Sequence, residues 1–262
     1  MLASRFPRIM AWLVICFLAL PVLVVVPISV TPHRYLSLPD GAISFRHYIS
    51  LVTDPRWVQG ITDSLVIACF ATVLAVILGT AFAVGLNRRA QIWQRVLQPL
   101  VLAPMIVPEI VHSLAYYRAW AFAGLLDTYV GVIFVHAMRG MPFVYLTVTA
   151  ALANLDPRTE QAARSLGASG WRALLWVVLP QIRNGVIGGA IFAFFLSWDE
   201  IVVVLFITLR QIYPLPRRIW DGLQDNIDPA IAALGTVMIL VTVLLMLIQM
   251  YKTGDSNSKG GM

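Results

Sequence analysis

Four ionisable side chains lie within long apolar stretches of this sequence: Glu109, Arg139, Asp199 and Glu200. A carboxylate in such a place could bind a cation, and an arginine could hold a carboxylate or a phosphonate through two parallel hydrogen bonds. Because an ionisable group at membrane depth is costly, it indicates a transport pathway or a binding site by default. We therefore take these residues as the candidate site.

The charges of these residues sum to −2, since three carboxylates oppose one arginine. A net-negative cavity with aromatic walls would stabilise a di-cation by charge pairing and by contact between rings and ammonium groups. The available aromatic side chains are Trp198, Tyr116, Tyr117 and Phe195. Each of them could equally be a packing residue or part of an interfacial belt.

Two interpretations of Glu109 and Arg139 are open at this point. Glu109 follows two prolines that are four residues apart, and these loosen a helix, as suits a segment that lines a pathway. Alternatively, Glu109 forms a buried ion pair with Arg139, which leaves Asp199 and Glu200 for a cationic solute. If Arg139 instead binds the solute, that solute is zwitterionic, such as an amino acid-like compound or a phosphonate.

The sequence contains none of the motifs G-x-x-x-x-G-K-[ST], H-E-x-x-H and G-x-S-x-G, so it lacks the usual phosphate loop for ATP and two common hydrolase signatures. An intramembrane hydrolase built on Asp199 or Glu200 would need a second catalytic group, which we do not find. His112 and His136 have no further ligands near them in the sequence, so we expect packing histidines and no metal site. We predict that the chain is not an enzyme.

The composition is that of a polytopic membrane protein. Of the 262 residues, 59% are hydrophobic and 12% are charged, and the mean hydropathy is +0.80, whereas soluble domains are about 25% charged. Six stretches can supply the roughly 20 residues that a membrane helix needs. They cover residues 9–32, 64–87, 96–117, 128–155, 184–209 and 229–251. The sequence therefore predicts an all-α protein with six transmembrane helices and no nucleic-acid partner.

Lysine and arginine predict the orientation of these helices. Eleven lie in one set of connecting segments and seven in the other, with Arg139 inside a helix. The larger group consists of Arg5, Arg8, Arg88, Arg89, Arg95, Arg158, Arg164, Arg172, Arg183, Lys252 and Lys259. Because cytoplasmic segments carry the excess of positive charge, we expect both termini and the 154–185 segment in the cytoplasm.

The polar interval 154–185, between two apolar stretches, has the pattern of a short surface helix. Asp156 can cap a helix that holds Pro157 in its first turn, and Gly167 can end that helix in a left-handed turn. A short helix with small residues and one carboxylate suits docking into a groove of another protein.

The residues of this interval resemble the coupling loop of ATP-binding-cassette importer permeases. The matching positions are Glu160, Ala162, Ala163, Gly167, Leu179 and Pro180, with Gln161 where the family prefers alanine. The resemblance implies the type I importer permease fold, with a cytoplasmic coupling helix seated on a separate ATPase subunit that binds ATP and Mg²⁺, so no cofactor is expected in this chain. It also implies a bacterial inner membrane location and, as partners, a second permease subunit, two ATPase subunits, an extracytoplasmic solute-binding protein and membrane lipid.

A second resemblance concerns the solute. The stretch FLSWDEIVVVLF at 195–206, with Tyr213-Pro214-Leu215-Pro216 after it, is similar to the polyamine-importer permeases. It implies uptake of a cation such as putrescine or spermidine. The candidate substrate pathway then consists of Asp199, Glu200, Glu109, Arg139, Trp198 and Tyr117. The zwitterionic alternative that uses Arg139 stays open, whereas a passive channel would need no dock for an ATPase.

We predict three parts in the chain. Residues 1–58 hold the first membrane helix and an extracytoplasmic segment, residues 59–251 form a permease core of five helices, and residues 252–262 form a disordered cytoplasmic tail. Gly185 and Gly189 have a spacing that permits close packing of helices, either within the chain or with a partner permease.

Overall fold

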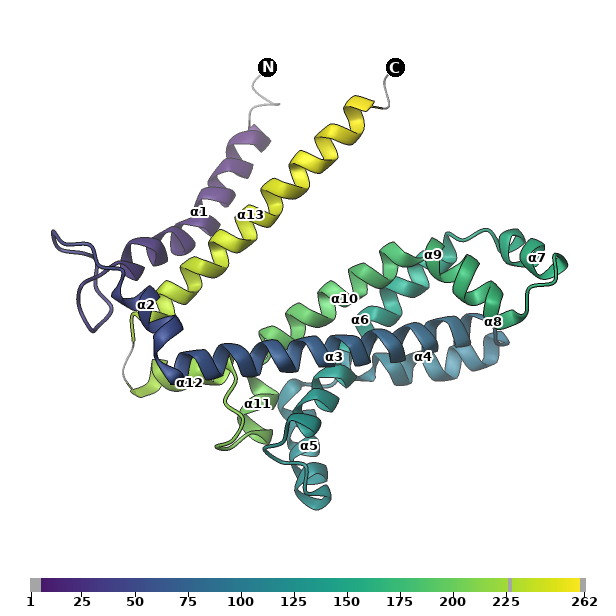
Figure 1. The fold of residues 1–262 in the computed structure, drawn as a ribbon, viewed down its shortest axis with the longest axis horizontal. Helices are drawn as coiled ribbons and strands as arrows, with labels where there is room; N and C mark the ends of the chain where they lie inside the picture. Colours follow the sequence, from purple (N-terminus) through teal and green to yellow (C-terminus); the bar gives the residue numbers. More distant parts are fainter. Residues whose placement is uncertain (1–5, 226–227, 260–262) are drawn as a thin grey trace. The chain divides into compact units, whose positions relative to one another are not determined.

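The computed structural model describes residues 6–225 and 228–259, and every regular element in that part of the chain is a helix. This confirms the predicted all-α class. The helices, labelled in Figure 1, fall into two compact units. One unit consists of Met1–Val58 and Ile219–Met262, and the other of Gln59–Arg218. All predicted site residues lie in the second unit.

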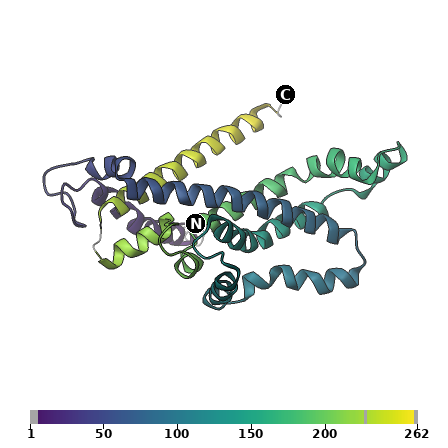
Figure 2. The ribbon, with the colours of Figure 1, turned by 60° about the horizontal axis from the view of Figure 1, so that its bottom comes forward.

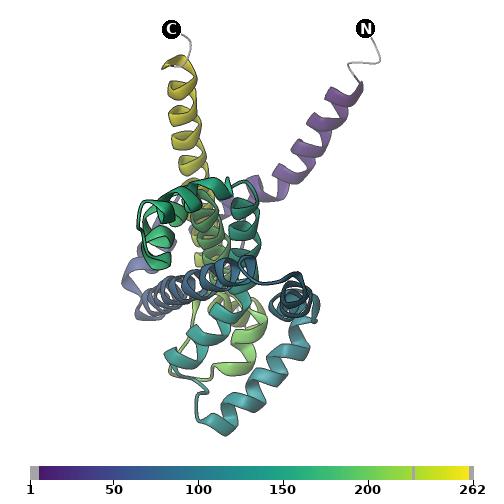
Figure 3. The ribbon, with the colours of Figure 1, turned by 90° about the vertical axis from the view of Figure 1, so that its right-hand side faces the viewer.

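The first unit is built on two long helices, α1 (Phe6–Ser29) and α13 (Ala230–Lys259), with the short α2 (Arg46–Thr53) against α13. The two long helices contact each other, and Figure 3 shows them diverging toward the two ends of the chain. The hydroxyl groups of Ser29 and Tyr48 lie 2.6 Å apart and join the end of α1 to α2.

Helix α13 continues to Lys259 and so enters the 252–262 segment for which the sequence predicts a disordered tail. Residues 260–262 of that tail lie outside the described residues. Because α13 packs on α1 and α2, it groups with them, whereas the sequence-based division places it in the 59–251 core.

The second unit holds most of the other helices. In chain order, the helices after α2 are α3 (Pro55–Asn87), α4 (Gln91–Ile106), α5 (Glu109–Ala123), α6 (Tyr129–Ala153), α7 (Pro157–Ser165), α8 (Gly170–Ala173), the π-helix η1 (Leu174–Val178), α9 (Leu179–Gln181), α10 (Arg183–Trp198), α11 (Val202–Ile207) and α12 (Leu215–Asp225). The boundary between the units falls within α3 and within α12.

Small residues let α3, α6 and α10 approach closely in the core of the second unit. A Cβ added to Gly79 of α3 would lie 2.8 Å from Val144 Cβ of α6, and one added to Gly189 of α10 would lie 2.7 Å from Val144 Cα. A Cβ on Gly185 would lie 2.6 Å from Ala151 Cβ. The glycine spacing at 185 and 189 therefore serves the packing of α10 on α6 within the chain.

Three helices are long and apolar enough to cross a membrane: Arg8–Ser29, Pro55–Asn87 and Tyr129–Ala153. Two bent helix pairs raise the number to five among the described residues if each pair counts as one span. Helix α13 adds a shorter apolar stretch, Ala230–Leu244. The count of six spans therefore stays a prediction.

The predicted helix 96–117 is broken near its middle. Helices α4 and α5 meet at 100°, and Figure 2 shows α5 turned out of the line of α4. Pro108 has no N–H group and disfavours helical backbone at the residue before it, and Val107 accordingly has an extended ψ of 132°. Glu109 is therefore the first residue of α5 and not an interior residue of one long helix.

The predicted helix 184–209 is broken as well, because α10 ends at Trp198 and α11 begins at Val202. The carboxylate of Glu200 accepts a hydrogen bond of 2.9 Å from the backbone N–H of Val203 and so satisfies a free donor at the start of α11. Asp199 and Glu200 therefore lie in the link between two helices, and not at adjacent positions of one helix as the sequence suggests.

Candidate functional site

Arg139 lies at the centre of the predicted charges. It belongs to the middle of α6 and is 6% exposed. Its Nη2 donates a hydrogen bond of 2.5 Å to Glu109 Oε1, and its Nη1 forms an ion pair with Glu200. The structure thus contains the Glu109–Arg139 pair that the sequence left open. The ion-pair interpretation of the sequence leaves Glu200 free for a solute. In the structure Glu200 is paired with Arg139 as well.

The two carboxylates on Arg139 differ in their access to solvent. The side chains of Arg139 and Glu200 are 7% and 5% exposed, whereas that of Glu109 is 52% exposed. A buried charge is tolerated when it has a partner, so Arg139 and Glu200 hold each other in place. Glu109 is the partner that solvent can reach.

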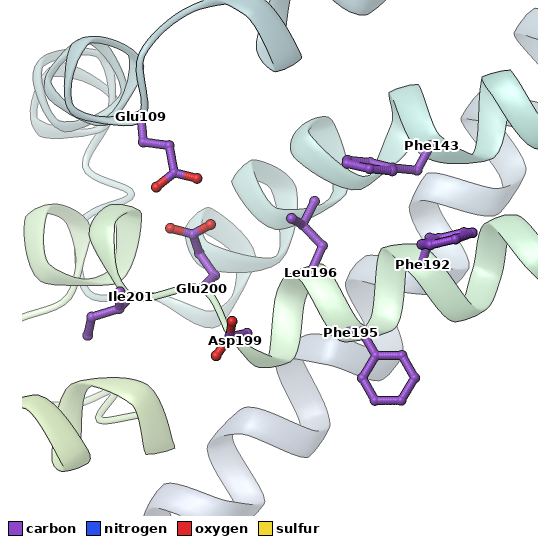
Figure 4. Close-up of a pocket in the computed structure, with 8 residues that line it drawn as sticks. All are labelled: Glu109, Phe143, Phe192, Phe195, Leu196, Asp199, Glu200 and Ile201. Carbon is purple, nitrogen blue, oxygen red and sulfur yellow. The ribbon is translucent and has the colours of Figure 1, made fainter. Parts of the chain in front are cut away.

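A cavity of 420 Å³ lies beside these charges, a size within the range of about 300–1,000 Å³ that is usual for small-molecule sites. It is lined by Glu109, Phe143, Phe192, Phe195, Leu196, Asp199, Glu200 and Ile201. Figure 4 shows the carboxylates of Glu109 and Glu200 directed toward each other. Arg139 is not among the residues that line the cavity, although it pairs with two of the carboxylates that do.

The aromatic side chains of the cavity are partly those expected. Phe195 lines it, together with Phe143 and Phe192, whose rings are stacked with centroids 6.2 Å apart. Trp198 stacks on Phe194 of α10 instead. Tyr117 of α5 is 42% exposed and is not among the residues that line the cavity. The composition of a helix does not fix its rotation, so the sequence could not choose between these rings.

The two buried histidines differ in their contacts, and one of them joins two helices. His136 of α6 forms a hydrogen bond of 2.8 Å with the hydroxyl group of Ser197 on α10. His112 of α5 packs with its ring centroid 5.7 Å from that of Tyr116. No group of three or more His, Cys, Asp or Glu side chains suited to a metal ion occurs in the described part of the chain.

The 154–185 interval begins with the helix that its sequence predicts. The side chain of Asp156 accepts a hydrogen bond of 2.9 Å from Arg158 N, and Pro157 is the first residue of α7. Gly167 follows the helix with a φ of +90°, the left-handed region that favours glycine. Both the start and the end of α7 therefore follow from local capping.

Glu160 turns its carboxylate toward two arginines of its own chain. Its Oε1 accepts hydrogen bonds from Arg88 Nη2 at 2.9 Å and from Arg164 Nη2 at 2.8 Å. Of the two alanines, Ala163 is partly buried and Ala162 is exposed. The carboxylate and the two alanines thus lie together on α7, as the motif predicts, but with different exposure.

The end of the motif is separated from α7 by α8 and the π-helix η1. Leu179 and Pro180 open α9 directly after η1. Large apolar side chains are exposed over the same interval: Leu166 is 90% exposed, Trp171 is 67% exposed and Trp176 is 80% exposed. Exposed apolar surface of this kind suits a contact with another protein or with lipid.

Asp127, in the turn between α5 and α6, is a residue that the sequence analysis missed. Its carboxylate accepts hydrogen bonds of 2.8–3.1 Å from four consecutive backbone N–H groups, those of Leu209, Arg210, Gln211 and Ile212. Burial raises the pKa of Asp127, but the four donors outweigh it and hold the pKa below the usual 3.8. Asp127 therefore fixes the segment that follows α11, over a sequence separation that no local pattern could reveal.

Both the sequence and the fold are similar to those of known transport proteins. Residues 71–251 match the family described as binding-protein-dependent transport system inner membrane component. The chain is 27% identical to the spermidine/putrescine transport system permease protein PotC of Haemophilus influenzae, over 94% of this chain and 95% of that protein. It is 28% identical to the putrescine transport system permease protein PotI of Escherichia coli K12, over 85% of this chain and 82% of that protein.

The fold is similar to that in a crystal structure of a bacterial ABC transporter involved in the import of the acidic polysaccharide alginate. The TM-score is 0.75 at 15% identity, over 95% of this chain and 96% of that chain. The likeness at this identity concerns the fold alone. Because the family match covers more than half of the chain, this protein belongs to the inner-membrane permease components of binding-protein-dependent transport systems, which are transport subunits and not enzymes.

Proposed function

We propose that this chain is a permease subunit of an ATP-driven importer that carries a small cationic solute of the polyamine class, such as putrescine or spermidine. The observation that carries the proposal is the cavity at the two helix breaks, which is lined by three carboxylates, whereas Arg139 pairs with two of them and is not among the lining residues. The similarity to PotC, a spermidine/putrescine permease protein, and to PotI, a putrescine permease protein, supports the same class of solute.

The charge balance of the cavity favours a cation with two ammonium groups. Glu109, Asp199 and Glu200 carry three negative charges and Arg139 carries one positive charge, which leaves −2. Two unit charges about 4 Å apart interact by about 4 kcal/mol at an effective dielectric constant of about 20. Contact with the phenyl rings of the wall adds about 0.5–2 kcal/mol for each ammonium group. A di-cation would therefore leave the occupied cavity neutral.

Asp199 is the first carboxylate that we assign to the solute. It lines the cavity and is exposed, and it forms no ion pair within the described residues. Glu109 is the second, because it is half exposed and can exchange Arg139 for an ammonium group. Glu200 then acts mainly on the arginine and on the start of α11.

The zwitterionic alternative would require Arg139 to receive a carboxylate or a phosphonate of the solute. Both terminal nitrogens of Arg139 already contact carboxylates. An incoming anion would have to displace Glu109 or Glu200 and would enter a cavity that they line. The arrangement therefore favours the cation over the zwitterion.

We assign the 154–185 loop as the coupling element of the importer. The exposed apolar residues Leu166, Trp171 and Trp176 provide a contact surface for another protein. In the proposed assembly this surface meets a cytoplasmic ATPase subunit, which binds ATP and Mg²⁺. A second permease subunit, a second ATPase subunit and an extracytoplasmic binding protein complete the complex, with both termini of this chain in the cytoplasm.

The solute class can be tested by uptake into proteoliposomes that contain the full complex with ATP on the ATPase side. Labelled putrescine, spermidine, glycine betaine and 2-aminoethylphosphonate are compared in the wild type and in Asp199→Asn. We expect uptake of putrescine or spermidine in the wild type and at least about a tenfold loss in the variant, since about 1.4 kcal/mol corresponds to a factor of ten.

Asp40→Asn is the matched control, because it removes a carboxylate from the loop between α1 and α2, where Asp40 pairs with His33. It should leave uptake unchanged. Normal polyamine uptake by Asp199→Asn would remove Asp199 from the pathway. Uptake of the phosphonate or the betaine by the wild type, without uptake of either polyamine, would overturn the cationic class.

A further inference from the structure

The carboxylate of Glu160 is bound from within the chain on the side of α7 that faces the protein. Its side chain is 21% exposed, and Glu160 Oε1 receives both Arg88 and Arg164. The Arg164 contact lies within α7, one turn further along. The Arg88 contact links α7 to a segment 72 residues earlier in the chain.

Arg88 lies in the turn between α3 and α4, which is itself held to the end of α3. The side-chain amide of Gln94 donates to Leu86 O at 3.3 Å and to Arg89 O at 3.2 Å. Arg89 N also donates to Leu86 O at 3.0 Å. These bonds close the end of α3, so the backbone at Arg88 moves with that helix.

The end of α3 that carries Arg88 is part of the hydrophobic core. Ala83 is 2% exposed, Val84 is 7% exposed and Leu86 is 5% exposed, in one cluster with residues of α6 and α10. A force applied to Arg88 would therefore reach the packed core of the unit directly. The covalent route from α7 to α10 instead passes through three short elements, α8, η1 and α9, and through the connections at 166–169 and 182.

The surface of α7 thus divides into two sides. Glu160 and the partly buried Ala163 face the chain, whereas Leu166, just after the helix, is 90% exposed. A partner that docks on the exposed side leaves the Arg88–Glu160 contact in place. Movement of the docked helix would then pull on α3 through this contact.

We infer that Arg88 is a positioning residue that transmits displacement of α7 to α3 through Glu160. The inference rests on the proposed coupling role of the 154–185 loop and adds a second route for the movement. An ion pair at the surface contributes little to stability, and the Arg88 and Glu160 side chains are 36% and 21% exposed. Loss of the pair should therefore leave the fold intact and impair only transmission.

The test measures ATP hydrolysis and solute uptake together in proteoliposomes that contain the full complex. In Arg88→Gln we expect hydrolysis within about twofold of the wild type and uptake reduced at least about fivefold, so that fewer solutes enter per ATP. The ATPase subunits should co-purify in normal amounts. Arg89→Gln is the matched control, because Arg89 is adjacent and its side chain forms no ion pair in the described part of the chain.

The charge-reversed pair Arg88→Glu with Glu160→Arg separates transmission from a merely structural role. We expect each single reversal to uncouple the complex and the double reversal to restore at least half of the solutes per ATP. Normal coupling in Arg88→Gln overturns the inference. Failure of the double reversal, or loss of ATPase co-purification in Arg88→Gln, overturns it as well, since the pair would then act in folding or docking.

A failure of this inference can be distinguished from a failure of the proposed coupling role. If Gly167→Val uncouples the complex but Arg88→Gln does not, the loop is the coupling element and the Arg88 route is absent. If neither variant changes the number of solutes per ATP, the coupling role of the loop itself is wrong.

Discussion

Arg139 of α6 donates a hydrogen bond of 2.5 Å to Glu109, the first residue of α5. The same guanidinium forms an ion pair with Glu200 in the link between α10 and α11. Each carboxylate belongs to one of the two helix breaks. One side chain thus attaches both breaks to α6, and the shape of the cavity depends on it.

Replacement of Arg139 by glutamine should destabilise the protein. It would leave Glu200, whose side chain is 5% exposed, without its counter-ion, and breaking a buried pair in this way costs about 3–5 kcal/mol. We expect a lower midpoint of thermal unfolding in detergent for Arg139→Gln. The midpoint of Arg139→Lys should lie between those of the wild type and Arg139→Gln, because an ammonium group keeps the charge but lacks the planar guanidinium group.

The double variant Arg139→Gln with Glu200→Gln serves as the control for the buried charge. It should recover part of the loss, since position 200 would no longer hold a buried carboxylate without a counter-ion. If Arg139→Gln unfolds at the wild-type temperature, Arg139 does not hold the breaks. If Arg139→Gln keeps polyamine uptake and loses only uptake of a phosphonate, the result favours the interpretation in which Arg139 binds a zwitterionic solute.

The packing of α10 on α6 predicts opposite effects for two adjacent glycines. A Cβ on Gly189 would lie 2.5 Å from Thr147 Oγ1 and 2.7 Å from Val144 Cα, whereas a Cβ on Gly188 would meet nothing within 4 Å. Gly189→Ala should destabilise by about 1–3 kcal/mol through overpacking. Gly188→Ala should be neutral or stabilise by up to about 1 kcal/mol. Thermal unfolding of the purified variants would show equal midpoints if this packing were incorrect.

Asp127 should contribute stability that depends on pH. Its pKa is below 3.8 in the folded chain because four N–H donors outweigh the effect of burial. A lowered pKa gives stability that is complete above the unfolded value, about 3.9, and is lost as the pH falls through the folded value. We expect Asp127→Asn to lose about 1–3 kcal/mol at pH 7, with the difference from the wild type narrowing only below about pH 4.

The backbone at Asp127 makes asparagine the proper replacement. Asp127 has a φ of +55°, which asparagine tolerates as well as aspartate does, so the variant changes the charge and not the backbone strain. Thermal unfolding across pH 3–7 is the measurement. If the difference in unfolding midpoint between the wild type and Asp127→Asn stays constant over that range, the negative charge of Asp127 does not contribute to stability.

Gly167→Val should uncouple ATP hydrolysis from uptake. Gly167 has a φ of +90°, and a β-branched residue there costs about 1–3 kcal/mol in strain, which would displace the end of α7. We expect normal membrane insertion and at least about a fivefold drop in solutes per ATP.

Gly41→Val is the matched control for Gly167→Val, because Gly41 has a φ of +89° in the loop between α1 and α2. A Cβ at either glycine would meet nothing within 4 Å, so the two substitutions impose the same backbone strain in different places. Gly41→Val should keep normal coupling. Normal uptake by Gly167→Val would refute the role of this turn.

The sequence predicted those features that local chemistry determines. Asp156 and Pro157 start α7, and Gly167 follows its end, because capping and left-handed turns depend on neighbouring residues only. The apolar stretches likewise gave the helical class. The charges at membrane depth identified the residues that meet at Arg139.

The breaks in two predicted helices could not be located in the same way. Hydropathy averaged over a whole span does not show that the helices stop at Val107 and at Asp199. Arg139 stabilises both breaks from a helix that is distant in sequence. The orientation of Trp198 away from the cavity wall depends on helix rotation, which only the packed structure fixes.

The glycine contacts also limit how the second unit can move. With Gly79 and Gly189 against Val144, sliding α3 or α10 along α6 would drive backbone into side chains. We therefore expect the three helices to move together. Helix α6 has 25 residues and is about 38 Å long at about 1.5 Å per residue. A small displacement at one end of these helices would therefore be accompanied by a displacement at the other end.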